Sequence, residues 1–245
     1  MSEPDQITTA PGDVRPVRWG MGDAAAGWFL AQFGGLVVFS LVVAVSGVDP
    51  DNTDDLSLGW FAVAQLGLWF GFLGVPWFVA RTKGNGLRRD FRVWGEAWDS
   101  VRGLAVGVVS QLFVLPLLYI PIYVLFDKDQ DDVTEVARQM TDRATDSVGV
   151  VLLVLIVGIG APIAEEIFYR GLVFRSIENR LGTWPGIVIS GVVFGASHFQ
   201  LLQFLGLAVF GGILAYVTHR TGRLAPAIFA HMAFNLAAVI PLVLD

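Results

Sequence analysis

Two adjacent glutamates lie at the end of an apolar stretch of the sequence, where ionisable side chains are costly. Arg170 follows Glu166 by four residues, so on a helix the two lie on one face and can form an ion pair. Glu165 points about 100° away from Glu166 and lacks this partner. Pro162 removes a helix hydrogen bond just before the acids, and we expect a kink there that helps to admit water. Glu165 is therefore the carboxylate left free for chemistry.

Two histidines and an asparagine lie in two later apolar stretches. His198 follows Phe194 by four residues and Asn235 follows His231 by four, so each pair projects from one helix face. If these stretches pack against the one that carries Glu165, a carboxylate base, two imidazoles and an amide meet in a cavity of low polarity. Such a set can activate a water molecule and stabilise an oxyanion. The predicted catalytic residues are Glu165, Glu166, His198, His231 and Asn235.

Other residue patterns for hydrolysis are missing from the sequence. The chain has no cysteine, which excludes disulfides, thiolate metal sites and a cysteine nucleophile. Neither the His-Glu-x-x-His pattern nor the Gly-x-Ser-x-Gly pattern occurs. A lone histidine or asparagine in a membrane often only joins helices. Two adjacent glutamates have no such structural explanation, because one arginine compensates only one of them.

The composition is that of a membrane protein with several spans. Of the 245 residues, 54% are hydrophobic and 16% are charged, against about 25% charged in soluble proteins. Seven apolar stretches approach the roughly 20 residues that cross a bilayer. They predict an all-α, polytopic transmembrane bundle of about seven spans. The expected spans are residues 24–46, 57–80, 101–126, 147–168, 185–200, 201–218 and 223–243. The fifth and sixth are short, so one of them is a candidate re-entrant segment.

Basic residues gather on one side of this expected bundle. All of the 16 lysines and arginines except Lys128, Arg138 and Arg143 fall in the N-terminal tail or in the second, fourth and sixth loops. Because basic residues accumulate in cytoplasmic loops, the N-terminus is expected to be cytoplasmic. The other side carries acids, in residues 49–55 and 127–146. No basic groove with interleaved aromatic residues points to nucleic acid.

The expected spans do not by themselves bring the site together. Straight helices place Glu165 about 8 Å and His198 about 21 Å from the cytoplasmic boundary. Either the helix of Glu165 continues past residue 168, or the helix of His198 begins outside the bilayer. Residues 171–183 are amphipathic and can supply the first alternative. Residues 90–100 are either a short amphipathic surface helix or an ordinary connector.

Taken together, the three motifs resemble a known family. Glu-Glu-x-x-x-Arg, Phe-x-x-x-His and His-x-x-x-Asn, in this order, resemble the CPBP family, which groups CAAX prenyl proteases with bacteriocin-processing and self-immunity membrane proteins. The resemblance covers residues 147–240, which are expected to form a CPBP-like protease core. Residues 21–146 are expected to supply further membrane helices and loops, and residues 1–20 a disordered N-terminal tail.

The resemblance implies a role for each residue of the motifs. Glu165 would be the base that acts on water, with His198 as its partner and Glu166 as support. His231 and Asn235 would hold the oxyanion. The family is also described as metalloproteases in which such residues bind zinc. A metal-free site that needs no cofactor and a zinc site of Glu165, His198 and His231 therefore both remain open.

These observations predict an intramembrane endopeptidase in the plasma membrane of a bacterium. It would hydrolyse a peptide bond in a membrane-associated or lipidated protein or peptide, with that substrate and the lipid bilayer as its partners. One alternative is a non-catalytic membrane scaffold or a bacteriocin-immunity-type protein, for which Glu165→Gln would preserve function. Another is a small transporter or lipid-handling protein in which Glu165 and Glu166 relay protons.

Overall fold

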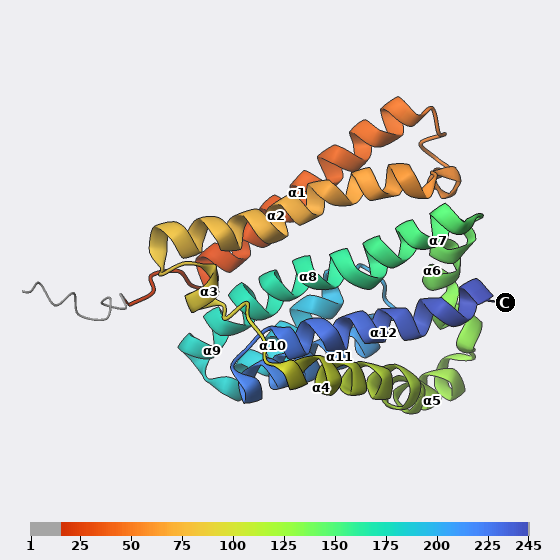
Figure 1. Cartoon of the computed structure of the whole chain (residues 1–245). Helices are drawn as coiled ribbons and strands as arrows, with labels where there is room; N and C mark the ends of the chain where they lie inside the picture. The colour runs from red at the N-terminus through yellow and green to blue at the C-terminus, as the bar shows by residue number, and fades with distance from the viewer. Residues whose placement is uncertain (1–15, 245) are drawn as a thin grey trace, which may run out of the picture.

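The chain folds into a bundle of long helices (Figure 1). The computed structural model describes residues 16–244, and this part contains no β-strand. Six of its helices are long and apolar enough to cross a membrane. They are α1 (Met21–Ser46), α2 (Leu58–Lys83), α4 to α5 (Ala97–Phe126), α7 to α9 (Ser147–Leu181), α11 (Phe204–Thr221) and α12 (Ala225–Leu244). The predicted all-α, polytopic bundle is confirmed. Of the predicted tail, residues 1–15 lie outside the described part, and residues 16–20 form no helix.

The predicted span at residues 185–200 is a shorter helix, α10 (Thr183–Ala196). Its 14 residues rise about 21 Å, less than the roughly 30 Å of a bilayer core. The Ser197 hydroxyl donates to the Val193 carbonyl and accepts a hydrogen bond from Trp28, and such bonding competes with the helix backbone. Phe199 has a φ of +55°, in the left-handed region that a right-handed helix cannot include. The helix therefore ends before His198.

α10 and α11 form an antiparallel hairpin. The Glu178 Oε1 atom accepts a hydrogen bond from Thr183, at the start of α10, and bonds His219, near the end of α11. The hairpin therefore enters and leaves the bundle at the same end, and residues 197–203 form its tip. Among the described residues, six candidate spans and this shorter helix replace the seven spans expected from the sequence.

The helix that carries the two glutamates extends well past its expected end at residue 168. It runs without a break over the 35 residues Ser147–Leu181, about 52 Å at 1.5 Å per residue. This confirms the first of the two alternatives that the depths of Glu165 and His198 left open, the continuation of this helix past residue 168. Two π-helical segments, η3 (Val154–Gly160) and η4 (Ile167–Phe174), flank the turn α8 (Ala161–Glu166). Such segments are frequent at functional sites because they displace side chains from the regular helix.

The hydrophobic core includes the residues that directly follow the two glutamates. Phe168 stacks on Phe72 of α2 with ring centres 4.7 Å apart, and Tyr169 packs edge-on against Phe194 of α10. α1 and α2 approach closely through small residues, since a Cβ atom at Gly67 would lie 2.8 Å from the Val38 side chain. Small residues allow such close packing of membrane helices. The core thus fixes the glutamate-bearing helix against α2 and α10.

Short elements cap the two ends of the bundle (Figure 1). At one end α3 (Leu87–Asp90) precedes α4 (Ala97–Val109). Of residues 90–100, residues 91–96 form a connector without helix, whereas residues 97–100 are the first turn of α4. At the other end lie the 3-10 turn η1 (Thr53–Asp55) and α6 (Gln130–Asp142). Arg143, directly after α6, donates to the carbonyl of Leu56, directly after η1, at 3.0 Å. We call the end of the bundle with Arg88 and Arg89 in α3 the basic end. The end with Asp131 and Asp132 in α6 is the acidic end.

The two ends are expected on opposite sides of the membrane, with the basic end in the cytoplasm. Because the chain has no native cysteine, Ser57→Cys at the acidic end and Asn179→Cys in α9 (Arg175–Leu181) at the basic end can be labelled one at a time. An impermeant maleimide added to intact cells is expected to label Ser57→Cys, and to label Asn179→Cys only after the membrane is opened. Labelling of both from the same side would rule out this arrangement.

Candidate active site

Glu166 and Arg170 form a fully buried ion pair. An Arg170 guanidinium nitrogen donates to Glu166 Oε1 at 2.9 Å, and both side chains are 0% exposed. A second guanidinium nitrogen donates to the Gly211 carbonyl of α11 at 3.0 Å. The guanidinium carbon also lies 4.4 Å from the ring centre of Phe194, within the range of a cation–π contact. The pairing predicted from the four-residue spacing is confirmed, and it ties the glutamate-bearing helix to α10 and α11.

His231 lies between the two glutamates. Its Nδ1 atom donates to Glu166 Oε1 at 2.8 Å, since a carboxylate oxygen can only accept. Its Nε2 atom lies 3.9 Å from Glu165 Oε2, too far for a direct hydrogen bond. Glu166 therefore accepts from both Arg170 and His231, and it turns the second nitrogen of the ring toward Glu165. The sequence predicted that these residues meet, but not that His231 lies between Glu166 and Glu165.

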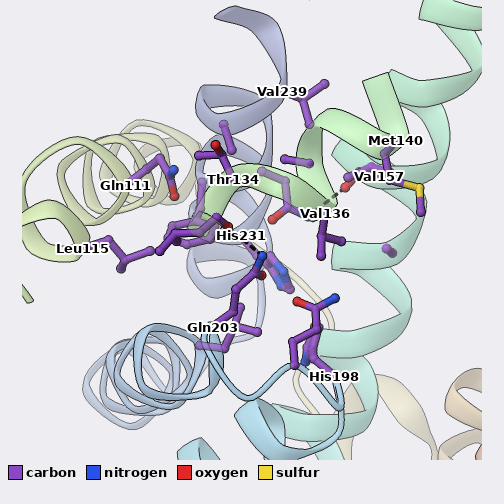
Figure 2. Close-up of a pocket in the computed structure, with 18 of the residues that line it drawn as sticks. Gln111, Leu115, Thr134, Val136, Met140, Val157, His198, Gln203, His231 and Val239 are labelled. Carbon is purple, nitrogen blue, oxygen red and sulfur yellow. Dashed lines mark hydrogen bonds between the residues drawn. The ribbon is translucent and has the colours of Figure 1, made fainter. Parts of the chain in front are cut away.

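Glu165 and His198 face one cavity of about 310 Å³. Glu165 Oε2 is buried and accepts no hydrogen bond from a described residue. The Nδ1 atom of His198 lies 2.8 Å from the Phe194 carbonyl oxygen, to which it must donate, so in a neutral ring Nε2 carries the lone pair. The two side chains form no direct hydrogen bond with each other. Figure 2 shows His198 and His231 on this cavity.

Asn235 fills a gap in the helix that carries Glu165. Its amide nitrogen donates to the Val157 carbonyl at 2.8 Å. In η3 the Ala161 N–H donates to the Ile156 carbonyl, five residues back. In the same register the Val157 carbonyl would accept from the N–H of residue 162. Pro162 has no N–H. Asn235 supplies the missing hydrogen bond, which leaves its second amide hydrogen for the predicted role at an oxyanion.

This account predicts that Asn235 and Pro162 are energetically coupled. Asn235→Leu is expected to lower the free energy of unfolding by about 1–3 kcal/mol, because the Val157 carbonyl loses its donor. In a Pro162→Ala background the new N–H can bond to this carbonyl, so the same substitution is expected to cost clearly less. The coupling is measured by unfolding the native protein, the two single variants and the double variant in mixed micelles. Equal costs in both backgrounds would contradict this role of Asn235.

The described residues do not form a three-ligand zinc site. No three histidine, cysteine, aspartate or glutamate side chains within residues 16–244 are grouped so that they could hold one metal ion. In particular, Glu165, His198 and His231 line one cavity but are not gathered as a ligand set. Structural and catalytic zinc sites need at least three protein ligands. The residues present therefore do not fit the zinc alternative, and no step proposed below uses a metal.

Several cavity residues escaped the sequence analysis. The sequence indicates only an acidic loop at α6, yet Val133 and Met140 of this helix line the cavity. Gln203 at the hairpin tip holds α6 in place by donating to the Val133 carbonyl at 2.8 Å. Gln65 of α2 and Gln111 of η2 (Ser110–Val114) also line the cavity. The sequence did carry a signal for these two residues, since each is a polar side chain within a long, mainly apolar helix.

The segment that carries the three motifs is similar to known proteins. Residues 147–237 match the family described as type II CAAX prenyl endopeptidase Rce1-like. Over 89 residues the chain is 33% identical to the "Putative membrane peptidase YdiL" of Bacillus subtilis (strain 168), and the matched segment covers 36% of each protein. No solved structure gives a significant match. The resemblance to CPBP proteases is thus confirmed for the segment that carries all three motifs.

Proposed function

We propose that this chain, which shares a core segment with Rce1-like membrane endopeptidases, is an intramembrane endopeptidase. It hydrolyses a peptide bond in a membrane-associated or lipidated protein or peptide by means of a water molecule that Glu165 activates. The observation that carries the proposal is the contrast between two adjacent acids. Glu166 is neutralised by Arg170, whereas Glu165 faces a cavity with an oxygen that no described residue hydrogen-bonds.

The charges of Glu165, Glu166 and Arg170 balance if the cluster holds one additional proton. Arg170 compensates Glu166, so a proton on His231 compensates Glu165 and avoids an unpaired buried charge. In this state Glu165 is an anionic base, and His231 presents an N–H at Nε2 toward the cavity. The His198 Nε2 lone pair can hold one hydrogen of a water molecule, while Glu165 accepts the other.

The proposed reaction follows from these positions. Glu165 removes a proton from the water molecule as its oxygen bonds to the carbonyl carbon of the substrate. The carbonyl electrons move to oxygen, and the resulting oxyanion accepts hydrogen bonds from His231 and from the free amide hydrogen of Asn235. Glu165 then passes its proton to the leaving nitrogen as the C–N bond breaks. The products are a new carboxyl terminus and a new amino terminus.

The proposal is tested in cells by comparing the terminal peptides of membrane proteins. Cells that express the native chain are compared with cells that express Glu165→Gln at a matched level. Termini that appear only with the native chain would identify both the proteolysis and its substrates. If the two sets of termini were identical while both proteins conferred the same phenotype, a non-catalytic scaffold would replace the enzyme.

A metal-free site predicts that strong chelators have no effect. Cleavage by the purified protein in liposomes is expected to change less than twofold after dialysis against 1,10-phenanthroline, because the described residues gather no ligand set. Initial rates before and after dialysis measure this. A loss of activity that added zinc restores would show that the ligands come together only in the working enzyme.

A further inference from the structure

Four arginines at the basic end form no ion pair with any residue from 16–244. They are Arg88 and Arg89 of α3, Arg92 of the connector that follows it, and Arg175 of α9. α3 and α9 lie at the same end of the bundle (Figure 1). Arg223, also at this end, is by contrast paired with both Glu96 and Asp99. The positive charge of the four arginines is therefore uncompensated within the described part of the chain.

The acids nearest to these arginines in the sequence are engaged by other groups. Asp90 accepts hydrogen bonds from the Trp19 indole and from the Asn85 main chain. Glu178, three residues after Arg175, is bonded to Nδ1 of His219 at 2.6 Å. Neither acid is within ion-pair distance of the four arginines. The lack of compensation thus results from how the local side chains are arranged.

Two of the four arginines converge on one main-chain oxygen. The Arg175 guanidinium donates to the Gly222 carbonyl at 3.1 Å, and the Arg92 guanidinium donates to the same oxygen at 3.5 Å. Nε of Arg175 is buried and has no partner among the described residues. Like charges that meet at one oxygen repel each other, and burying an uncompensated charge is costly. The preference of basic residues for one side of a membrane does not require this convergence. A bound anion would offset both costs.

The main chain holds Arg92 in this position. Its φ is +50°, in the left-handed region that residues other than glycine rarely adopt. Its carbonyl accepts a hydrogen bond from the Leu224 N–H at 3.3 Å. A Cβ atom at Gly222 would lie only 2.6 Å from Nη1 of Arg92, so a glycine is needed for the guanidinium to approach. Uncommon backbone conformations of this kind are frequent at functional sites. The convergence of Arg92 with Arg175 is therefore a built feature of the fold.

We propose that the basic end binds the phosphate group of an anionic membrane lipid. The open pocket that would receive it is lined by Arg88, Arg89, Arg92 and Trp94. A guanidinium group donates two parallel hydrogen bonds, which match the oxygens of a phosphate. Trp94 and Trp98 are 41% and 66% exposed, and such rings favour the headgroup level of a membrane. Basic pockets beside membrane helices bind anionic headgroups. None of the pocket residues lines the cavity of Glu165, so the inference does not depend on the proposed function.

The test measures lipid binding directly, by native mass spectrometry of the full chain released from detergent micelles. The protein is titrated with phosphatidylglycerol and with phosphatidylcholine of the same acyl chains. Phosphatidylglycerol is expected to bind about tenfold more tightly, because only its headgroup carries a net negative charge. Arg89→Gln/Arg92→Gln is expected to weaken the binding of phosphatidylglycerol by about fivefold or more. The same variant is expected to leave the binding of phosphatidylcholine unchanged.

Arg180→Gln/Arg220→Gln is the matched control, because it removes two exposed charges at the same end but outside the pocket. It is expected to change the affinity for phosphatidylglycerol less than about twofold, since exposed charges are screened by salt. Without added lipid, Arg89→Gln/Arg92→Gln is expected to unfold at the native temperature or higher, because it removes a like charge beside Arg175. Lost binding in this variant would then not reflect lost folding.

Millimolar glycerol phosphate separates a lipid from a soluble ligand, because it carries the same phosphate without acyl chains. It is expected to leave phosphatidylglycerol bound. Displacement of the lipid by glycerol phosphate would show that the pocket takes a soluble phosphate compound and would overturn the assignment to a lipid. Equal affinity for the two lipids, or equal effects of the two double variants, would overturn the inference altogether.

Discussion

Glu165→Gln is expected to lower the rate of peptide cleavage by about two to four orders of magnitude, the usual contribution of a general base. Glutamine has the shape of glutamate but cannot take a proton from water. Because no described residue hydrogen-bonds Glu165 Oε2, the substitution breaks no hydrogen bond at that atom, and the thermal stability of the protein is expected to change little. Initial rates of the purified proteins in liposomes, with a substrate found in cells, measure the effect.

Glu135→Gln is the matched control for this experiment. Glu135 is exposed on α6, outside the cavity, and among the described residues it accepts a hydrogen bond only from Gln139. Its replacement removes one carboxylate and is expected to leave the rate of cleavage unchanged. If Glu165→Gln cleaved within threefold of the native rate, Glu165 would not be the base, and the transfer of its role from the family resemblance would be wrong.

The second large effect is expected on stability, from Arg170→Met. This change leaves Glu166 as a buried anion without its cation, and breaking one side of a buried ion pair costs about 3–5 kcal/mol. The double variant Glu166→Gln/Arg170→Met removes both charges and is expected to regain much of this loss. Unfolding in mixed micelles of detergent and dodecyl sulfate gives the free energy of unfolding for each protein.

An exposed ion pair provides the comparison. Arg138 and Asp131 in α6 are paired at 2.7 Å, but their side chains are 49% and 74% exposed. Arg138→Met is therefore expected to cost at most about 1 kcal/mol. If Arg170→Met cost no more than Arg138→Met, or if the double variant were as unstable as the single one, the buried pair would not stabilise the site as described.

The parts of the site that depend on local spacing could be predicted from the sequence. Four residues between Glu166 and Arg170 place them on one helix face, and the structure pairs them. The separate direction of Glu165 follows from the same geometry. The mismatch in depth between Glu165 and His198 left two alternatives open, and the structure confirms the one in which the glutamate-bearing helix continues beyond residue 168.

The parts that depend on backbone register and on tertiary packing could not be predicted. Hydropathy does not distinguish a span from the shorter α10, because the end of this helix depends on the Ser197 hydroxyl and on the left-handed backbone of Phe199. The position of His231 between two acids requires the packing of α12 on the glutamate-bearing helix. The bond from Asn235 to the Val157 carbonyl depends on a π-helical register that no sequence pattern here revealed.

Hydrolysis by activated water is tested most directly with isotopically labelled water. The purified native protein and Glu165→Gln, each in liposomes with the same substrate, are incubated in water enriched in ¹⁸O, and the products are weighed by mass spectrometry. The account predicts that the native protein produces a new carboxyl terminus carrying ¹⁸O and that Glu165→Gln produces almost none. Equal amounts of labelled product from both proteins, or no product from the native protein with any substrate found in cells, would contradict it.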